Sequence, residues 1–164
     1  MDESVMSIIT RTIAVADLEA RYLTIAELQT IRDFFAAGQQ RLRIANILAA
    51  NSQTIINTGT LRFWERCPIT PSNSGNPIYR ASCIRDQGWY IRLVTYALIE
   101  GDTKVIDTVG IRGAKEMYIS LGIPLRNLVE CMHCLKEAAI SLLSLDDAMV
   151  VTPYFDYIIA GLTP

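Results

Sequence analysis

The chain of 164 residues has a single histidine, His133, and no cluster of lysine and arginine. There is no Ser/His/Asp set with room for catalysis, no glycine-rich phosphate loop and no carboxylate cluster with metal-ligand spacing. These absences predict that the protein is not an enzyme. The net charge of -2, with no basic cluster, argues against nucleic acid as the main partner.

Long apolar runs are also missing, since none reaches the ~18–20 residues that a membrane span needs. The beginning, Met1–Ser4, is acidic, so we expect no secretory signal peptide. Even so, 51% of the residues are hydrophobic and the mean hydropathy is +0.25. This is rich for a soluble monomer and predicts an apolar surface that a partner covers.

The four cysteines do not form a recognisable metal or redox framework. Cys131 and Cys134 form a CxxC pair around His133, so a redox or metal site is one interpretation. There is no second ligand pair of the zinc-ribbon kind. Residues three apart share a helix face, so the spacing is also explained by two thiols that pack side by side in a core. We favour this second interpretation.

Apolar residues recur at helical spacing along nearly the whole chain, and strand-like alternation is absent. Thr24 and Glu27 form a capping box that predicts a helix start. We expect Gly38 to end or break that helix, Gly59 to end or bend the next one, and Pro153 to kink or delay the last. The pattern predicts one all-α domain over residues 1–164 with eight or nine helices, not a simple four-helix bundle.

Residues 67–77 form the one long irregular stretch, because its prolines and Gly75 forbid a regular helix. A loop of this length in a compact domain is often functional. It leads directly into the helix that carries Cys83, so it could fold over a ligand there. The alternative is a surface loop that only joins two helix layers.

Cys83, Asp86 and Tyr90 have the spacing of one helical face. A thiol, a carboxylate and a phenol would then line one wall of a groove, which suits a large, flat, nitrogen-bearing ligand bonded to sulfur. Arg80 lies close to the same face, whereas Arg85 is roughly 200° from Cys83. The alternative is a core helix with one buried cysteine and exposed ion pairs.

The same segment, Cys83-Ile-Arg85-Asp86 followed by Trp89-Tyr90-x-Arg92 and Tyr96, resembles the subunits of phycobiliproteins. Three further segments resemble that family in the same order, so the resemblance covers nearly the whole chain. They are Asp17–Leu23, Gly110–Pro124 and Pro153–Ile159. Within the family the chain looks most like allophycocyanin α-type subunits, including the α-like core subunits that act as terminal emitters.

The resemblance implies a globin-like helical fold with an N-terminal helical hairpin that docks onto a β-type allophycocyanin subunit. Such heterodimers form trimeric rings that stack, with core linkers, into the phycobilisome core on the cytoplasmic (stromal) face of the thylakoid membrane. Asp17, Arg92 and Tyr96 resemble the polar contacts between the family's subunits. The alternative is a set of unrelated surface charges, worth under ~1 kcal/mol each. The implied function is light harvesting, with excitation energy passed towards chlorophyll photosystems.

The resemblance also implies phycocyanobilin, a linear tetrapyrrole, bound by a thioether at Cys83. Asp86 would accept hydrogen bonds from the pyrrole N–H groups, and Arg80 and Arg85 would hold the propionates. The remaining residues that the resemblance places around the pigment are Tyr90, Tyr118 and Leu121.

Trp64 and Cys67 depart from the family pattern. Trp64 either contacts a pigment and restricts its outer ring, which would shift absorption to the red, or packs in the core. Trp89 is expected in the core. Cys67 is a less favoured attachment point for a bilin.

Two other classes of protein compete with the bilin carrier. A haem-binding globin-like sensor needs a proximal histidine beside its pocket, and His133 lies beyond the pocket that the sequence predicts. A thiol redox enzyme built on Cys131 and Cys134 lacks the βαβ context that usually accompanies such a motif.

Overall fold

The computed structural model describes residues 7–164, and over these residues the chain is helical without strands, which confirms the all-α prediction. The spacing of apolar residues also predicts a helix from about Ser4 to Val15, and its first residues, Ser4 and Val5, lie outside the described residues. Eight α-helices are accompanied by a 3₁₀-helix, η2, and a π-helix, η3. Their bounds are α1 Ile8–Leu18, α2 Ile25–Ala36, α3 Gly38–Ala50, α4 Ser52–Arg66, η2 Pro71–Asn73, α5 Pro77–Glu100, η3 Ile106–Ile111, α6 Ala114–Ser120, α7 Leu125–Ile140 and α8 Leu145–Leu162.

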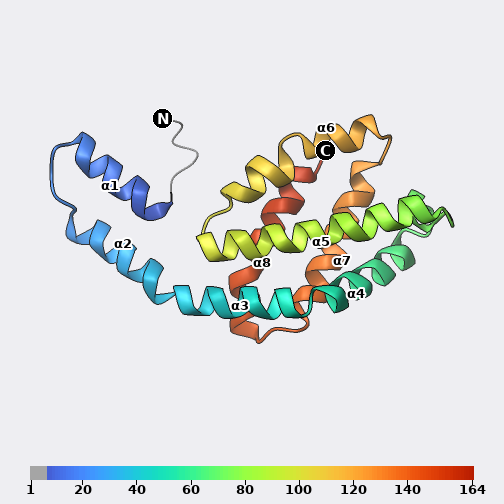
Figure 1. Ribbon diagram of the computed structural model, residues 1–164, viewed down its shortest axis with the longest axis horizontal. Helices are drawn as coiled ribbons and strands as arrows, with labels where there is room; N and C mark the ends of the chain where they lie inside the picture. The colour runs from blue at the N-terminus through green and yellow to red at the C-terminus, as the bar shows by residue number, and fades with distance from the viewer. Residues whose placement is uncertain (1–6) are drawn as a thin grey trace.

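Helices α3 to α8 form the body of the molecule, and the hairpin of α1 and α2 extends away from it (Figure 1). Helix α5 runs through the middle of the body. The principal packing contacts join α4 to α7, α3 to α5 and α7 to α8. None of the helices described is long and apolar enough to cross a membrane.

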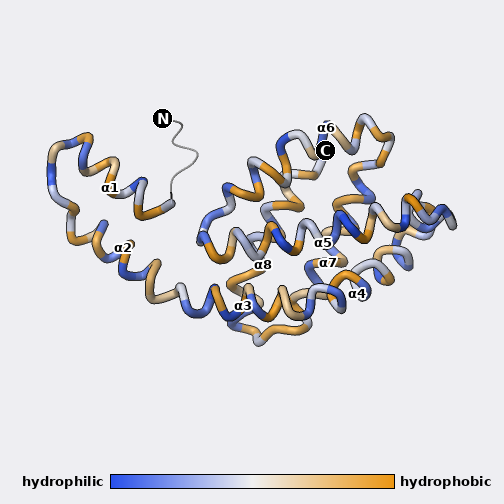
Figure 2. The backbone as a smooth tube through the Cα atoms, viewed as in Figure 1, coloured by the Kyte–Doolittle hydropathy of each residue, from blue (hydrophilic) through white to orange (hydrophobic). Residues whose placement is uncertain are grey.

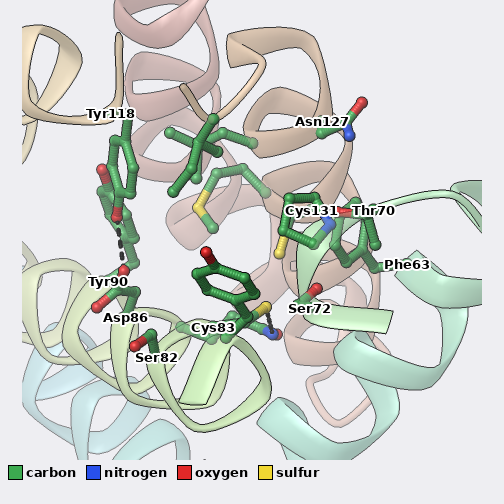
Figure 3. A pocket seen from close by; sticks show the side chains of 16 residues that line it. Phe63, Thr70, Ser72, Ser82, Cys83, Asp86, Tyr90, Tyr118, Asn127 and Cys131 are labelled. Carbon is green, nitrogen blue, oxygen red and sulfur yellow. Dashed lines mark hydrogen bonds between the residues drawn. The ribbon is translucent and has the colours of Figure 1, made fainter. Parts of the chain in front are cut away.

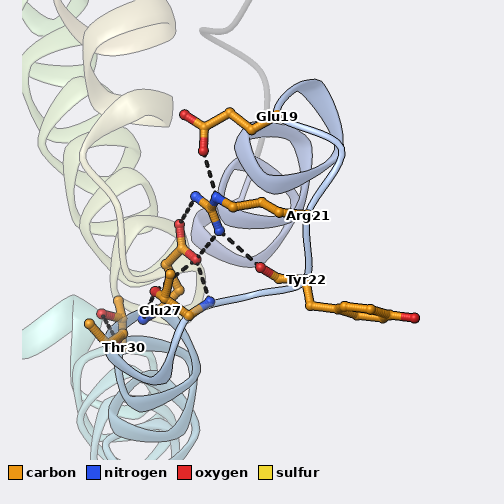
Figure 4. Close-up of polar contacts among 7 residues, drawn as sticks. Glu19, Arg21, Tyr22, Glu27 and Thr30 are labelled. Atoms are coloured by element: carbon orange, nitrogen blue, oxygen red, sulfur yellow. Dashed lines mark hydrogen bonds and ion pairs between the residues drawn. The ribbon is translucent and has the colours of Figure 1, made fainter.

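Ion pairs of Arg21 and a helix-capping box stabilise the turn of the hairpin (Figure 4). The Thr24 hydroxyl and the Glu27 carboxylate form the predicted capping box at the start of α2. The Arg21 guanidinium donates to both Glu27 oxygens, at 2.8 and 2.9 Å, and also to Glu19. The hydrogen bonds from Arg21, with those of Thr24, lower the pKa of Glu27 to about 2. The turn therefore keeps its charge pairs throughout the neutral range.

The hairpin leaves several large apolar side chains exposed. Figure 2 shows that hydrophobic residues recur along α1 and α2. No residue of α2 is buried in this chain. An unpartnered apolar surface of this extent is typical of an interface. Its members include Ile13, Val15, Leu18, Tyr22, Ile25, Leu28 and Phe35.

The prediction that Gly59 ends a helix is wrong. The chain breaks earlier, at Asn51, and α4 continues through Gly59 to Arg66. A Cβ atom added at Gly59 would lie 3.2 Å from both the Cα and the Cδ1 atoms of Leu135 on α7. Gly59 is therefore a point of close helix packing and not a helix end.

Other sequence signals for helix ends have mixed outcomes. The break at Gly38 is confirmed, because α2 ends at Ala36 and α3 begins at Gly38. Pro153 does not delay the last helix, which begins at Leu145 and continues past the proline. Gly101 ends α5 in the left-handed conformation, with φ of 73°.

Cys131 and Cys134 are both buried on α7, as two packed thiols would be. Within residues 7–164, no group of three or more histidine, cysteine, aspartate or glutamate side chains could hold a metal ion. Trp89 is partly buried against the core, as expected.

We predict that Gly59→Ala lowers the free energy of unfolding by about 1 kcal/mol. Overpacking against the Leu135 backbone costs about 1–3 kcal/mol, whereas alanine in a helix gains up to about 1 kcal/mol. Urea unfolding followed by circular dichroism measures the difference. Gly38→Ala is the control, because its Cβ would meet only the Arg41 guanidinium, at 3.8 Å. Equal stability of the two variants would contradict the packing role of Gly59.

Candidate functional site

A pocket beside Cys83 lies between helices α4, α5, α6 and α7 and is covered by the loop that contains η2 (Figure 3). It encloses about 600 Å³ of space not filled by protein atoms, its open mouth included. The lining residues are Phe63, Thr70, Pro71, Ser72, Tyr79, Ser82, Cys83, Asp86, Gln87, Tyr90, Tyr118, Ile123, Asn127, Leu128, Cys131 and Met132.

One side of the pocket gathers hydrogen-bonding groups around the Cys83 sulfur. Gln87, one helical turn along α5, donates its amide N–H to the sulfur at 3.4 Å and to the Thr60 hydroxyl at 2.8 Å. Cys131 and Ser72 lie on the same side of the pocket (Figure 3). Hydrogen bonding with the Cys131 thiol, helped by Ser72 and Gln87, lowers the pKa of Cys83 to about 6. This occurs although burial and the Asp86 charge oppose it.

The other side of the pocket holds a carboxylate and two phenols. The Tyr118 hydroxyl donates to Asp86 Oδ2 at 3.1 Å, and the Arg85 guanidinium donates to Oδ1 at 2.9 Å. The Tyr90 hydroxyl donates to the carbonyl of Gly110 at 3.0 Å. Burial raises the pKa of both phenols well above the ordinary value for tyrosine, so they remain neutral donors.

The irregular segment after Cys67 covers the pocket, which agrees with the functional interpretation of this loop. Thr70, Pro71 and Ser72 from the loop line the pocket directly. The Trp64 indole N–H donates to the Ser72 hydroxyl at 3.0 Å and ties the loop to α4. The Arg80 guanidinium lies over the Trp64 ring, 4.7 Å from its centre. Trp64 thus contacts both the covering loop, through Ser72, and α5, through Arg80.

The structure brings together four of the eight site residues that the sequence suggested: Cys83, Asp86, Tyr90 and Tyr118 line the pocket. The shared face of Cys83, Asp86 and Tyr90 on α5 is confirmed. Arg85 is not a lining residue, in agreement with its position on the helical wheel, but its side chain turns back to Asp86.

The other three candidates lie outside the lining. Leu121 follows the end of α6, and its side chain is 65% exposed. It does not line the pocket, which corrects that expectation. Trp64 and Arg80 are not lining residues, and Trp64 contacts the covering loop only through Ser72. Cys67 borders a separate hollow with Arg66 and Arg126.

Three important lining residues were missed or misassigned by sequence reasoning. Gln87 follows Cys83 by four residues, so the helical spacing could have placed it on the same face. Cys131 was considered only as half of a CxxC pair. Ser72 comes from an irregular loop, whose fold gives no periodic signal.

The donor set fits a planar, nitrogen-rich pigment better than a metal or a haem. One nucleophilic sulfur, one carboxylate and neutral phenols face a mainly apolar pocket. A carboxylate has about four lone-pair sites. Tyr118 and two N–H groups of Arg85 occupy three of those on Asp86, so it can accept about one further N–H donor, and more if Arg85 turns away. His133 is not a lining residue, so the pocket offers no histidine for the axial position of a haem.

Comparison with known proteins agrees with this chemistry. Residues 11–162 match the family described as Phycobilisome protein. The allophycocyanin alpha-B chain of Synechococcus sp. is 44% identical over 160 residues, covering 96% of this chain and 98% of that relative. The allophycocyanin subunit alpha-B of Nostoc sp. is 44% identical over 161 residues, covering 96% and 100%. The allophycocyanin alpha chain of Porphyra purpurea is 42% identical over 160 residues, covering 96% and 99%.

The chain therefore belongs to the phycobilisome protein family, and its helices have the globin-like arrangement of that family. Its members are light-harvesting proteins and not enzymes, as the sequence predicted. Within the family, this chain is an allophycocyanin α-type subunit of the phycobilisome.

We predict that the stability of the protein falls as the pH rises above about 10, and that Tyr118→Phe makes this fall shallower. The folded state raises the pKa of Tyr118, so its neutral phenol supports the fold below pH about 10 and this support is lost at higher pH. The slope difference is up to about 1.4 kcal/mol per pH unit.

Urea unfolding at pH about 8 and pH about 10.5, on either side of the ordinary tyrosine pKa, measures this slope. Tyr22→Phe is the control, because Tyr22 is fully exposed at the hairpin turn. If both variants kept the slope of the parent chain, Tyr118 would not be the group that titrates.

Proposed function

We propose that this subunit carries phycocyanobilin through a thioether between the Cys83 sulfur and the side chain of pigment ring A. The pigment supplies strong absorption of red light and the excited state that is passed on. The thiol adds across a carbon–carbon double bond: sulfur bonds to one carbon and the thiol proton goes to its neighbour. No oxidant or leaving group is needed. The observation that carries the proposal is the convergence of Cys83, Asp86 and Tyr118 in one pocket.

Asp86 is proposed to accept hydrogen bonds from the pyrrole N–H groups of the middle rings. A carboxylate beside these nitrogens favours the protonated, extended pigment. The Tyr118 hydroxyl, at 3.1 Å, orients the carboxylate from α6, and Tyr90 forms the neighbouring wall. A packed pocket keeps the pigment extended and stiff, so that excitation energy leaves by transfer and is not lost to internal motion.

Arg80 and Arg85 are proposed to hold the two propionates at the pocket mouth. Both side chains are on the exposed side of α5. Arg85 pairs with Asp86 at 2.9 Å in this structure, so it would have to turn outwards to reach a propionate. Leu121 could contact only a part of the pigment that extends beyond the lined pocket.

The proposed partner is a β-type allophycocyanin subunit that covers the apolar surface of the α1–α2 hairpin. The exposed side chains of that hairpin supply the apolar area. Asp17, Arg92 and Tyr96, which are also exposed, are the candidates for polar contacts with the partner. We further propose that residues 1–164 act as one domain and that the heterodimers form stacked trimeric rings. Core linkers would hold these rings at the cytoplasmic (stromal) face of the thylakoid, where energy passes towards chlorophyll photosystems.

The attachment is tested by producing the chain with a β-type allophycocyanin subunit and the phycocyanobilin pathway. After denaturation in acid urea, the parent chain should remain coloured and Cys83→Ala should be colourless. Cys67→Ala is the matched control and should stay coloured, because Cys67 borders a different hollow. Loss of colour from the parent on denaturation would contradict the thioether. A parent chain that never becomes coloured would contradict the pigment itself.

We also propose that the subunit is a red-shifted or far-red form and that Trp64 contributes to the shift. Trp64 does not line the pocket, so its contribution would come through Ser72 and the loop that covers the pigment. A loop fixed by this hydrogen bond would restrict rotation of an outer pigment ring and keep it coplanar with the other rings. A flatter, more conjugated pigment absorbs further to the red.

Trp64→Leu should move the absorption maximum of the assembled, pigmented protein to shorter wavelength. Trp64→Phe keeps an aromatic ring beneath Arg80 but loses the donor to Ser72, so it separates the two interactions. An unmoved maximum in Trp64→Leu would show that Trp64 only packs, which is the other interpretation of this residue.

A further inference from the structure

Gln87 places an amide in the wall of a mainly apolar pocket. The residue lies on α5, is 1% exposed and lines the pocket together with apolar residues such as Phe63, Leu128 and Met132. Burial of an amide costs free energy unless its N–H and C=O groups find hydrogen-bond partners. The partners of this amide therefore indicate why a polar residue stands at this position.

The amide nitrogen of Gln87 is fully hydrogen-bonded. It donates to the Thr60 hydroxyl oxygen at 2.8 Å and to the Cys83 sulfur at 3.4 Å. An amide NH₂ group has two hydrogens, so each of them has one acceptor. Thr60 is buried on α4 and is not a lining residue. The nitrogen thus connects the sulfur to a buried hydroxyl outside the pocket lining.

The amide oxygen of Gln87 is buried and has no hydrogen-bond partner among the residues that the structure describes. It lies beside Gly59, where an added Cβ would be 3.3 Å away. A buried acceptor without a donor lowers stability, whereas apolar groups of the same shape in place of two bonded partners can be neutral or stabilising. Stability therefore does not require an amide at Gln87 or a hydroxyl at Thr60. The contact of the amide nitrogen with the Cys83 sulfur supplies a reason for both.

We propose that Gln87 is a positioning residue for the attachment of the pigment: Thr60 holds the Gln87 amide, and the amide holds the Cys83 sulfur in the orientation that faces the pocket. This inference rests on the proposed thioether at Cys83 and adds which residue sets the direction of its sulfur. The cysteine side chain turns about a single torsion, and two of its three staggered rotamers are common in helices. The hydrogen bond from Gln87, one turn further along α5, favours the rotamer in which the sulfur lines the pocket.

The hydrogen bond from Gln87 is compatible with the addition of the thiol. Before the addition the sulfur accepts the Gln87 N–H, so the thiol proton is not used in this bond. In the addition, sulfur bonds to one carbon of the pigment double bond and the thiol proton goes to the neighbouring carbon. The thioether that results is still a weak acceptor. Gln87 therefore keeps the same partner after the reaction, and no buried donor is left unpaired.

The test separates binding of the pigment from formation of the bond. The full chain is produced with a β-type allophycocyanin subunit and the phycocyanobilin pathway, and samples are taken at equal times before the parent chain is fully loaded. Colour in the native protein measures all bound pigment, and colour that survives acid urea measures the share that is bonded to the chain. Gln87→Met should bind pigment as the parent does, but its bonded share should fall about two- to tenfold, the effect of one lost hydrogen bond.

Thr60 provides the decisive comparison, because it reaches the sulfur through Gln87. Thr60→Val has nearly the same shape without the hydroxyl, so we expect its bonded share to fall as well. Thr60→Ser keeps the hydroxyl and should remain close to the parent chain. Thr58→Val is the matched control on α4 and should leave the bonded share unchanged, since Thr58 is neither a lining residue nor a partner of the Gln87 amide.

The double variant with Gln87→Met and Thr60→Val tests whether the two residues act along one path. Its bonded share should equal that of Gln87→Met alone, because residues that act through one interaction are not additive. In urea unfolding without pigment, the double variant should be as stable as the parent chain. A marked loss of stability would show that the amide and the hydroxyl serve the fold, which would contradict the argument for positioning.

Equal bonded shares in the parent, Gln87→Met and Thr60→Val would overturn the proposal. So would a fall confined to Gln87→Met, since direct contact with the pigment would then explain it. An equal fall of bound and bonded pigment would mean that Gln87 only shapes the pocket. Each of these results, with a parent chain that stays coloured in acid urea, would leave the proposed thioether standing. A parent chain without colour in acid urea would instead contradict the proposed function.

Discussion

The close contact of α4 with α7 at Gly59 is the constraint on which the geometry of the Cys83 pocket depends. The absence of a side chain at Gly59 lets the Leu135 backbone approach, and an added Cβ would also lie 3.3 Å from Gln87 Oε1. Gln87 is thereby held against α4, where its amide reaches Thr60 and the Cys83 sulfur. The spacing of two helices thus determines where the nucleophilic sulfur is presented.

The chemistry of the pocket is divided between its two sides. The sulfur side is rich in weak, neutral donors, whereas the carboxylate side places Asp86 between Tyr118 and Arg85. The lining contains no lysine, arginine or histidine, and the guanidinium of Arg85, which pairs with Asp86, is not part of that lining. In such an arrangement the Cys83 sulfur can bond to one end of a pigment, while the Asp86 carboxylate neutralises the charge of the protonated rings in the middle of the pigment.

Sequence reasoning found the parts of this site that local periodicity encodes. The spacing of Cys83, Asp86 and Tyr90 was sufficient to predict that they share a face, because all three lie on one helix. The capping box of Thr24 and Glu27 predicted the start of α2. The role of Gly59 could not be read locally, because Leu135 lies far along the sequence. Ser72 and Cys131 join the site only through tertiary packing. Leu121 was misplaced because the end of α6 turns its side chain outwards.

The central claim is that Cys83 is the residue that carries the pigment, and mass spectrometry of the tryptic peptide Ala81–Arg85 tests it most directly. The peptide would be taken from the pigmented chain assembled with its β-type partner. The account predicts that its mass is increased by one intact phycocyanobilin. An unmodified peptide from a coloured chain would contradict it and would place the pigment on another residue or in a non-covalent site.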